Sequence, residues 1–156
     1  MKKKNKLIDS TLLFYLLSFT WGIIWTLVGL FALLGTFIFL NKKQRTYQVI
    51  KGRVVVYLPY TNFGGVSLGI VVIVSQLHPS LIKHELGHTI QSMLFGPLFI
   101  FLVAIPSGIR YQLFDWLSRR HYYKYGLNLD YDSAWFEGQA TRLGNVYFSE
   151  FTKENL

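Results

Sequence analysis

Residues 11–40 form an apolar stretch without a single charged residue, and this stretch restricts the possible folds more than any other feature. A helix needs roughly 20 apolar residues to cross the hydrocarbon core of a bilayer, so the stretch is long enough to span one with tilt. It is longer than the apolar part of a signal peptide, and no small-residue cleavage site follows it. We therefore predict an uncleaved transmembrane anchor, in preference to a cleaved signal peptide or a buried hairpin of two short helices.

The chain has a formal net charge of +8, and much of the excess flanks this apolar stretch. Basic residues beside a membrane segment attract anionic lipid headgroups, and no nucleic-acid-binding motif accompanies the charge. We therefore expect membrane lipid, and not nucleic acid, as a partner. Because both flanks are basic, the charge does not predict the orientation of the segment. The flanking residues are Lys2, Lys3, Lys4 and Lys6 before the stretch and Lys42, Lys43, Arg45, Lys51 and Arg53 after it.

Residues 1–45 are thus predicted to form a basic stretch and anchor, and residues 46–156 a single α+β domain. Two segments rich in β-branched and aromatic residues are predicted strands that can pair as a hairpin, although the pattern does not give their order in a sheet. After them come a helix with proline in its first turn, an apolar stretch that is buried or dips into the membrane, an amphipathic helix and a last helix. In order, these segments are residues 47–60, 66–75, 79–95, 94–109, 107–120 and 134–144.

The motif HELGH at residues 84–88 lies within the first helix of this domain. Positions i and i+4 stand on one face of a helix, so His84 and His88 can bind one metal ion. Glu85 projects beside them and can act as general base toward a zinc-activated water that attacks a carbonyl. With no cysteine in the chain, any metal must be held by histidines and carboxylates. The alternative is a purely structural pair of histidines.

The spacing of apolar residues predicts that this helix buries Ile82, Leu86, Ile90 and Met93. Gly87 weakens the helix by about 1 kcal/mol relative to alanine. Its presence indicates either a closely packed strand, room for a further metal ligand, or an ordinary helix crossing.

A catalytic zinc ion usually has three protein ligands and a water molecule. The downstream candidates for the third ligand are His121, Asp130, Asp132 and Glu137. Glu137 is the best placed, because it lies near the start of a helix and is followed one turn later by the small Ala140. The alternative for Glu137 is a first-turn carboxylate that the helix dipole stabilises. His121 is the second choice, although its basic and aromatic neighbours favour a surface or substrate contact.

HELGH followed by Glu137 and Ala140 resembles the gluzincin branch of the zincin metallopeptidases. This resemblance implies a minimal zincin-like fold, in which a small sheet packs on the HELGH helix and a later helix carries the third ligand. It also implies that His84, His88 and Glu137 bind zinc and that Glu85 is the general base. Thr141 stands where many gluzincins have an acidic residue that supports a ligand, so Asp132 or a backbone carbonyl is expected to take that role. The motifs HELGHTIQS, GPL, IPS and WFEGQAT, at residues 84–92, 96–98, 105–107 and 135–141, resemble a family of small bacterial membrane proteins.

In zincins the strand before the active-site helix pairs with the substrate backbone, which gives affinity with little sequence preference. The resemblance therefore implies substrate contacts from the strand that contains Gly65, Val66 and Gly69, with His121 as a further candidate. An oxyanion donor is expected among the polar residues downstream, although aromatic residues there also fit a membrane interface. These candidates are Arg110, His121, Tyr122, Tyr123, Tyr125 and Tyr131.

The leading hypothesis is a zinc metallopeptidase in the bacterial cytoplasmic membrane, either single-pass or monotopic, that hydrolyses a peptide or protein substrate. A non-catalytic, zincin-like membrane scaffold or interaction protein is the alternative. An intact Glu85 favours the enzyme, because a scaffold has no need of a general base.

Overall fold

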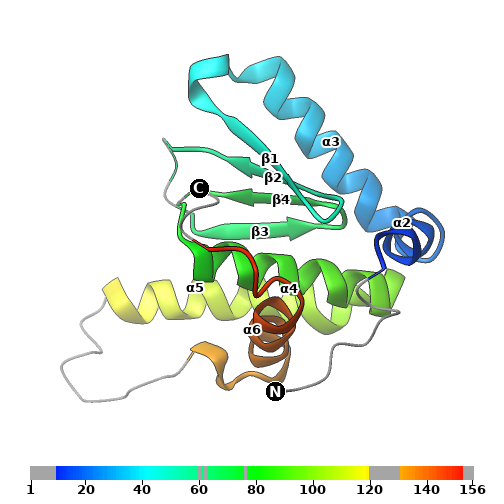
Figure 1. Cartoon of the computed structure of the whole chain (residues 1–156). Coiled ribbons are helices and arrows are strands. Elements are labelled where there is room, and N and C mark those ends of the chain that lie inside the picture. The colour runs from blue at the N-terminus through cyan, green and yellow to red at the C-terminus, as the bar shows by residue number, and fades with distance from the viewer. Residues whose placement is uncertain (1–9, 60, 62, 76, 120–130, 153–156) are drawn as a thin grey trace.

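The computed structural model describes residues 10–59, 61, 63–75, 77–119 and 131–152, and it has an α+β fold. Within these residues, five α-helices surround a mixed four-stranded sheet (Figure 1). The α+β class predicted from the sequence is thereby confirmed.

The apolar stretch near the N-terminus forms two helices instead of one. Helix α2 covers Thr11–Phe19 and helix α3 covers Ile23–Phe39, and the two are bent by 96° at the intervening residues. The bend is fixed by side chains: the Thr20 hydroxyl donates to the carbonyl of Leu16, and the Thr26 hydroxyl donates to that of Ser18. Because these bonds satisfy carbonyls at the end of α2, the helix can end within an apolar run.

In the described part of the chain, no single helix is both long and apolar enough to cross a membrane. Two bent pairs of helices reach the necessary length and hydropathy together. These are α2 with α3, and the pair formed by residues 79–98 and 100–113, which is bent by 120°.

Each of the two predicted strands is in fact a hairpin. The first contains β1 (Thr46–Ile50) and β2 (Arg53–Tyr57), and the second contains β3 (Gly65–Leu68) and β4 (Val71–Val74). Lys51 and Gly52 both have positive φ, as a tight two-residue hairpin turn requires, and Gly69 has φ +63° in the second turn. The two segments do not pair with each other as one hairpin, the arrangement that the sequence left open. They meet through the parallel pair β2–β4, so the order is β1-β2-β4-β3.

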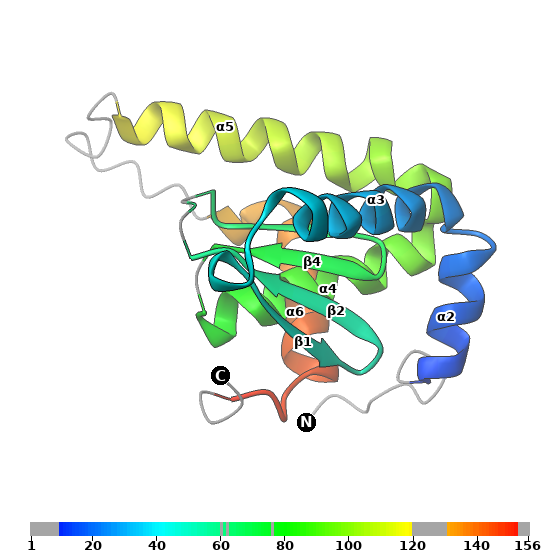
Figure 2. The same ribbon diagram turned by 90° about the horizontal axis from the view of Figure 1, so that it is seen from above.

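The sheet is covered on both faces. Helix α3 packs on one face, and helices α4 (Pro79–Phe95) and α6 (Trp135–Tyr147) pack below the other (Figure 1). The predicted buried face of α4 is confirmed, because Ile82, Leu86, Ile90 and Met93 are all buried. Seen from above, helix α5 runs along the side of the sheet away from β1, where β3 is the edge strand (Figure 2).

The chain between α4 and α6 is helical but irregular. A 3₁₀ turn (Gly96–Leu98) and a π-helical turn (Ile100–Ala104) precede α5 (Ile105–Arg119). Gly96 has φ +53° and ends α4, and Pro106 lies in the first turn of α5. A π-helical turn widens a helix locally and is frequent next to functional sites.

Candidate metal centre

Two histidines of α4 and one glutamate of α6 converge on a common point. One ligand atom from each of His84, His88 and Glu137 lies within 4.8 Å of the others. The Nε2 atoms of His84 and His88 are 3.1 and 3.3 Å from the same carboxylate oxygen, Oε2 of Glu137. The structure thus brings together the three residues that the sequence analysis proposed as ligands.

The close crossing of α4 and α6 makes this convergence possible. A β-carbon at Gly87 would overlap the carbonyl of Ala140, and one at Gly144 would overlap the carbonyl of Lys83. The two helices are therefore in backbone contact on either side of His84. Of the roles considered for Gly87, the structure shows a helix crossing, and the helix that crosses there, α6, is the one that carries Glu137.

The Nδ1 atom of His84 is held by a hydroxyl. Thr141 Oγ1 lies 2.8 Å from Nδ1 of His84 and donates its own proton to Oδ2 of Asp132 at 3.2 Å. A hydroxyl has only one proton, so Thr141 must accept from His84 and Nδ1 carries the hydrogen. Thr141 thereby links the imidazole to the carboxylate of Asp132, the residue expected to support a ligand.

The Nδ1 atom of His88 is held by an amide. Gln91 Oε1 lies 2.7 Å from it, while Gln91 Nε2 donates to the carbonyl of Phe136 and to Oε1 of Gln139, both at 2.8 Å. This network assigns the amide oxygen of Gln91 to His88, so Nδ1 of His88 is also the protonated nitrogen. Gln91 is completely buried and joins α4 to α6 beside the site.

These hydrogen bonds determine the role of the other ring nitrogen, Nε2, of each imidazole. With hydrogen on both Nδ1 atoms, a neutral imidazole presents a lone pair at Nε2. Two such lone pairs and a carboxylate oxygen point at one another, which is favourable only with a cation between them or with an imidazole protonated. Two atoms each about 2.0–2.1 Å from one zinc ion, at the tetrahedral angle, lie about 3.3 Å apart. The separations of Glu137 Oε2 from the two Nε2 atoms, 3.1 and 3.3 Å, are close to this value.

The ionisation of these groups reflects the same contacts. Burial of His88 opposes its charged form, but the hydrogen bond to Glu137 and the charges of Glu85 and Glu137 outweigh it and raise the pKa of His88. Burial of Glu137 also opposes ionisation. Hydrogen bonds from His84, His88 and Ser107 overcome it and lower the pKa of the Glu137 carboxyl. Glu137 is therefore an anion at neutral pH, as a metal ligand must be.

Glu85 lies against strand β3. The hydroxyl of Ser67 lies 2.8 Å from Oε2 of Glu85 and 2.6 Å from the backbone carbonyl of the same residue. A β-carbon at Gly65 would stand only 2.7 Å from Cγ and Oε1 of Glu85, so only glycine leaves room for this carboxylate. The position of Glu85 is thus determined by two residues of β3.

A cavity of about 330 Å³ lies in front of these groups. His84, Glu85 and His88 form its reactive wall, and residues 65–68 of β3 form a second. The other wall is mainly apolar and comes from α3, from the irregular segment before α5 and from the first turns of α5. Its residues include Trp25, Phe99, Val103, Ser107, Gly108 and Tyr111.

The other residues singled out in the sequence occupy different places. Gly65 and Val66 line the cavity. Gly69 does not line it: a β-carbon there would contact the backbone of Thr26, so this glycine allows α3 to pack on the β3–β4 turn. Arg110 donates to Oγ of Ser133, and this contact joins α5 to the segment before α6. Outside the described residues lie His121, Tyr122, Tyr123, Tyr125, Asp130 and the side chain of Tyr131.

Several residues of the site carry no signal that the sequence analysis used. Trp25 belongs to the apolar stretch predicted as an anchor, yet its indole N–H donates to the carbonyl of Ser67 at 3.0 Å. Ser107 and Tyr111 lie on the segment predicted as a surface helix. Gln91 is different, because the helical spacing of the sequence places it on the same side of the helix as His84 and His88.

Comparisons of the chain with protein-family models, curated proteins and solved structures found no match. The function proposed below therefore rests on the geometry and chemistry of the site.

Proposed function

We propose that the protein is a membrane-associated zinc metallopeptidase. The observation that carries the proposal is the convergence of two imidazole Nε2 atoms on one carboxylate oxygen, with both Nδ1 atoms held as donors by other side chains. Two histidines and a glutamate form a donor set found in catalytic zinc sites, which keep a fourth position for water. The cavity beside the three ligands supplies space for that position.

The roles of the chain's own residues follow from this placement. His84, His88 and Glu137 would hold the ion, which would supply Lewis acidity and lower the pKa of a bound water to about 7. Glu85 accepts the proton of the attacking water and returns it to the leaving amine. Ser67 and Gly65 keep the Glu85 carboxylate at the wall of the cavity. Gln91 and Thr141 hold the imidazoles in the tautomer that presents Nε2 to the ion.

The experiment that tests this proposal is metal analysis combined with a peptide-cleavage assay, on chain purified in detergent. Wild type and Glu85→Gln should contain stoichiometric zinc, whereas His88→Ala and Glu137→Gln should lose it. Glu85→Gln should cleave an unstructured peptide library about 10²–10⁴-fold more slowly than wild type, because the general base is missing.

Glu150→Gln is the matched control, because Glu150 is an exposed carboxylate beyond α6 and does not line the site cavity. It should retain both zinc and cleavage. Wild type without stoichiometric metal would contradict the proposal. Zinc binding without any cleavage by wild type would favour the non-catalytic scaffold instead.

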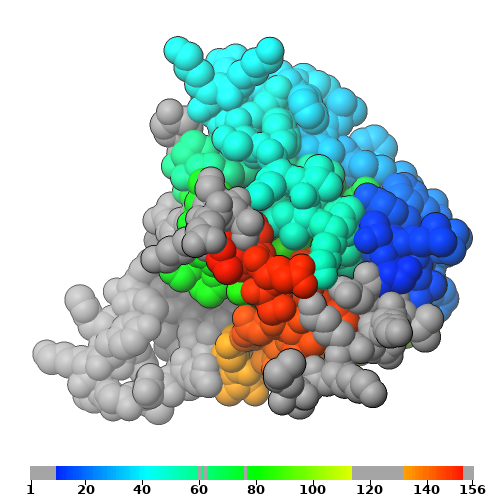
Figure 3. Space-filling model, in the orientation of Figure 1, coloured from blue at the N-terminus to red at the C-terminus, as the bar shows by residue number. Residues whose placement is uncertain are grey.

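Membrane association is proposed because of how the side chains of α3 are distributed between its inner and outer faces. In a helix of a soluble protein the large apolar side chains face inward, whereas most of those on α3 face outward. The buried residues of α3 are Thr26, Gly29 and Thr36, and Leu30 and Leu33 also pack against the core, while most of its large apolar side chains are exposed. Small and hydroxyl residues at a packed interface with apolar residues outside are typical of helices in lipid. The exposed apolar residues of α3 include Ile24, Leu27, Phe31, Leu34, Ile38 and Phe39. Helices α2 and α3 lie along one side of the molecule (Figure 3).

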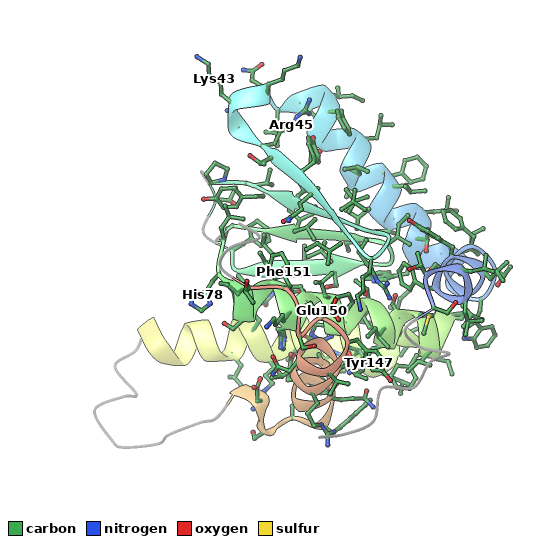
Figure 4. The ribbon with its side chains drawn as sticks, in the orientation of Figure 1. Lys43, Arg45, His78, Tyr147, Glu150 and Phe151 are labelled. Carbon is green, nitrogen blue, oxygen red and sulfur yellow. The ribbon has the colours of Figure 1, made fainter. Side chains whose placement is uncertain are left out.

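A second apolar surface extends from the end of α4 into α5, with Phe101, Ile105 and Ile109 exposed. It adjoins the first, because the Trp21 indole packs directly on Gly96 and the Trp25 and Phe99 rings are 5.6 Å apart. We name the two surfaces together the apolar flank. Basic residues lie at one end of it, where Lys43 and Arg45 follow α3 (Figure 4). This arrangement suits apolar insertion next to anionic headgroups.

Vesicle flotation tests the membrane proposal with three residues of nearly equal exposure. Phe31 and Phe101, on the apolar flank, are 70% and 69% exposed, and Val49 on β1 is 69% exposed. Phe31→Glu and Phe101→Glu should each weaken binding to phosphatidylglycerol-containing vesicles, since a charge in the bilayer costs about 2.5–3.5 kcal/mol. Val49→Glu should not. Equal loss in all three variants, or no binding by wild type, would contradict the proposal.

A further inference from the structure

The cavity has one wall that carries titratable side chains and another that is mainly apolar. On one side, α4 presents His84, Glu85 and His88, and β3 contributes residues 65–68. On the other side, the wall is formed by Trp25 of α3, by Phe99, and by Gly108 and Tyr111 of α5. Helices α3 and α5 also carry the apolar flank, so the cavity is lined by the two helices that are proposed to contact lipid.

The apolar wall reaches the surface of the molecule. On α5, Tyr111 lines the cavity and is 45% exposed. The apolar flank lies on the same two helices, with Ile109 of α5 63% exposed and Ile24 of α3 52% exposed. An apolar group that enters the cavity from the bilayer exchanges one apolar environment for another, which avoids the cost of exposing it to water.

The strand wall of the cavity offers hydrogen bonds suited to a polypeptide. Ser75 donates to the carbonyl of Gly64 at 2.8 Å, so Gly64 faces β4 and the alternate residues Gly65 and Ser67 face away from it. The Ser67 carbonyl on this free edge is occupied by the Trp25 indole. Gly65 is therefore the point at which an extended chain can pair with β3, and Glu85 lies directly beside it.

We propose that the site takes an extended, apolar segment of a membrane-anchored polypeptide, which reaches the cavity from the bilayer between α3 and α5. The proposal rests on the metallopeptidase function proposed above and names its class of substrate. The apolar wall and its place on the two helices that are proposed to contact lipid select an apolar segment. The outward-facing backbone at Gly65 selects a polypeptide over a lipid chain, which has no groups to pair with it.

Cysteine cross-linking in vesicles tests this inference, because the chain has no cysteine of its own. Gly108 and Gly35 are matched positions: both lie on the lipid-facing helices, and a β-carbon at either would contact nothing within 4 Å. Only Gly108 lines the cavity. Gly108→Cys and Gly35→Cys are each prepared in the Glu85→Gln background, so that bound polypeptide is not cleaved.

Three probes are offered under mild oxidation: a transmembrane peptide followed by an apolar segment with one cysteine, the same segment without the anchor, and a phospholipid with a thiol on its acyl chain. The anchored peptide should cross-link to Gly108→Cys about tenfold more than to Gly35→Cys, because binding raises its effective concentration only at the cavity. Equal cross-linking at the two positions would overturn the inference. Preference of Gly108→Cys for the thiol lipid or for the unanchored segment would also overturn it.

Zinc content is measured on the same samples, so that the two proposals can fail separately. Missing zinc contradicts the metallopeptidase function whatever the cross-linking shows. Stoichiometric zinc without preference of the anchored peptide for Gly108→Cys leaves that function standing and rejects the class of substrate.

Discussion

The chemistry of each histidine depends on a neighbour that never contacts the proposed ion. Nδ1 of His84 is held by Thr141 and Nδ1 of His88 by Gln91, through a hydroxyl–carboxylate pair in one case and an amide network in the other. Such residues orient metal ligands, and their loss typically lowers metal affinity 10–100-fold.

Thr141→Val should therefore lower zinc affinity by about 10–100-fold while leaving the fold intact, because valine keeps the shape and removes only the hydroxyl. Competition with a chromophoric chelator measures the affinity. Ser92→Ala is the control, since the Ser92 hydroxyl bonds to the Thr89 carbonyl on the same helix and touches neither imidazole. Unchanged affinity in Thr141→Val would show that the hydroxyl does not orient His84.

Gly65→Ala should separate metal binding from catalysis. The added methyl would stand 2.7 Å from Cγ of Glu85 and displace the carboxylate, while the three ligands remain untouched. We expect full zinc content and a kcat reduced by about 10²-fold, the cost of a misplaced catalytic group. Gly35→Ala, where the methyl meets open space, should leave kcat unchanged. Loss of zinc in Gly65→Ala would contradict this account of Glu85.

At the scale of elements, the site depends on how closely α4 and α6 cross. Gly87 and Gly144 remove the two side chains that would separate the helices, and Ala140 is the opposing residue at the first contact. The separation of two helices varies with the side chains between them, so these glycines determine whether Glu137 reaches the histidines.

Gly87→Ala should lower both stability and zinc affinity. Its methyl would overlap the Ala140 carbonyl, and an overpacked core typically costs about 1–3 kcal/mol. Gly35→Ala should instead stabilise the chain by up to about 1 kcal/mol, because alanine is the better helix former at an uncrowded position. Chemical denaturation and zinc competition measure the two effects. A Gly87→Ala variant as stable as wild type would show that the helices can separate without cost.

The sequence predicted the elements whose signals are local. The stripe of Ile82, Leu86 and Ile90 identified the buried face of α4, and the helical spacing of the histidines located the reactive side. The hairpin turn at Lys51 and Gly52 was missed because the flanking residues read as one continuous β segment. The parallel pairing of β2 with β4 joins segments distant in sequence, and no local pattern encodes it.

The bend between α2 and α3 was missed for a related reason. Hydropathy measures how apolar a stretch is and not whether its helix continues. Thr20 and Thr26, whose hydrogen bonds end α2, hardly change the mean hydropathy of the stretch. The contribution of Trp25 to the cavity could not be predicted either, because it depends on α3 packing over β3.

For the molecule as a whole, the proposed ion joins two helices that are otherwise held by packing and a few hydrogen bonds. A ligand that binds only the folded state stabilises it by RT ln(1 + [L]/Kd), which is about 4 kcal/mol at a thousandfold excess over Kd. Removing zinc with a chelator should therefore lower the Tm of wild type by several degrees, and added zinc should restore it. Thermal unfolding in detergent measures the effect, and a Glu137→Gln variant with the same chelator response would contradict the assignment.

The division of the ligands between α4 and α6 also has a consequence for biosynthesis. Helices α2 and α3 precede α4 and α6 in the chain, so their large apolar surfaces are made before the proposed metal centre. At that stage His84 and His88 have no carboxylate partner from α6. The proposed centre is completed only when α6 docks on α4, after the helices that carry the proposed membrane surface have been made.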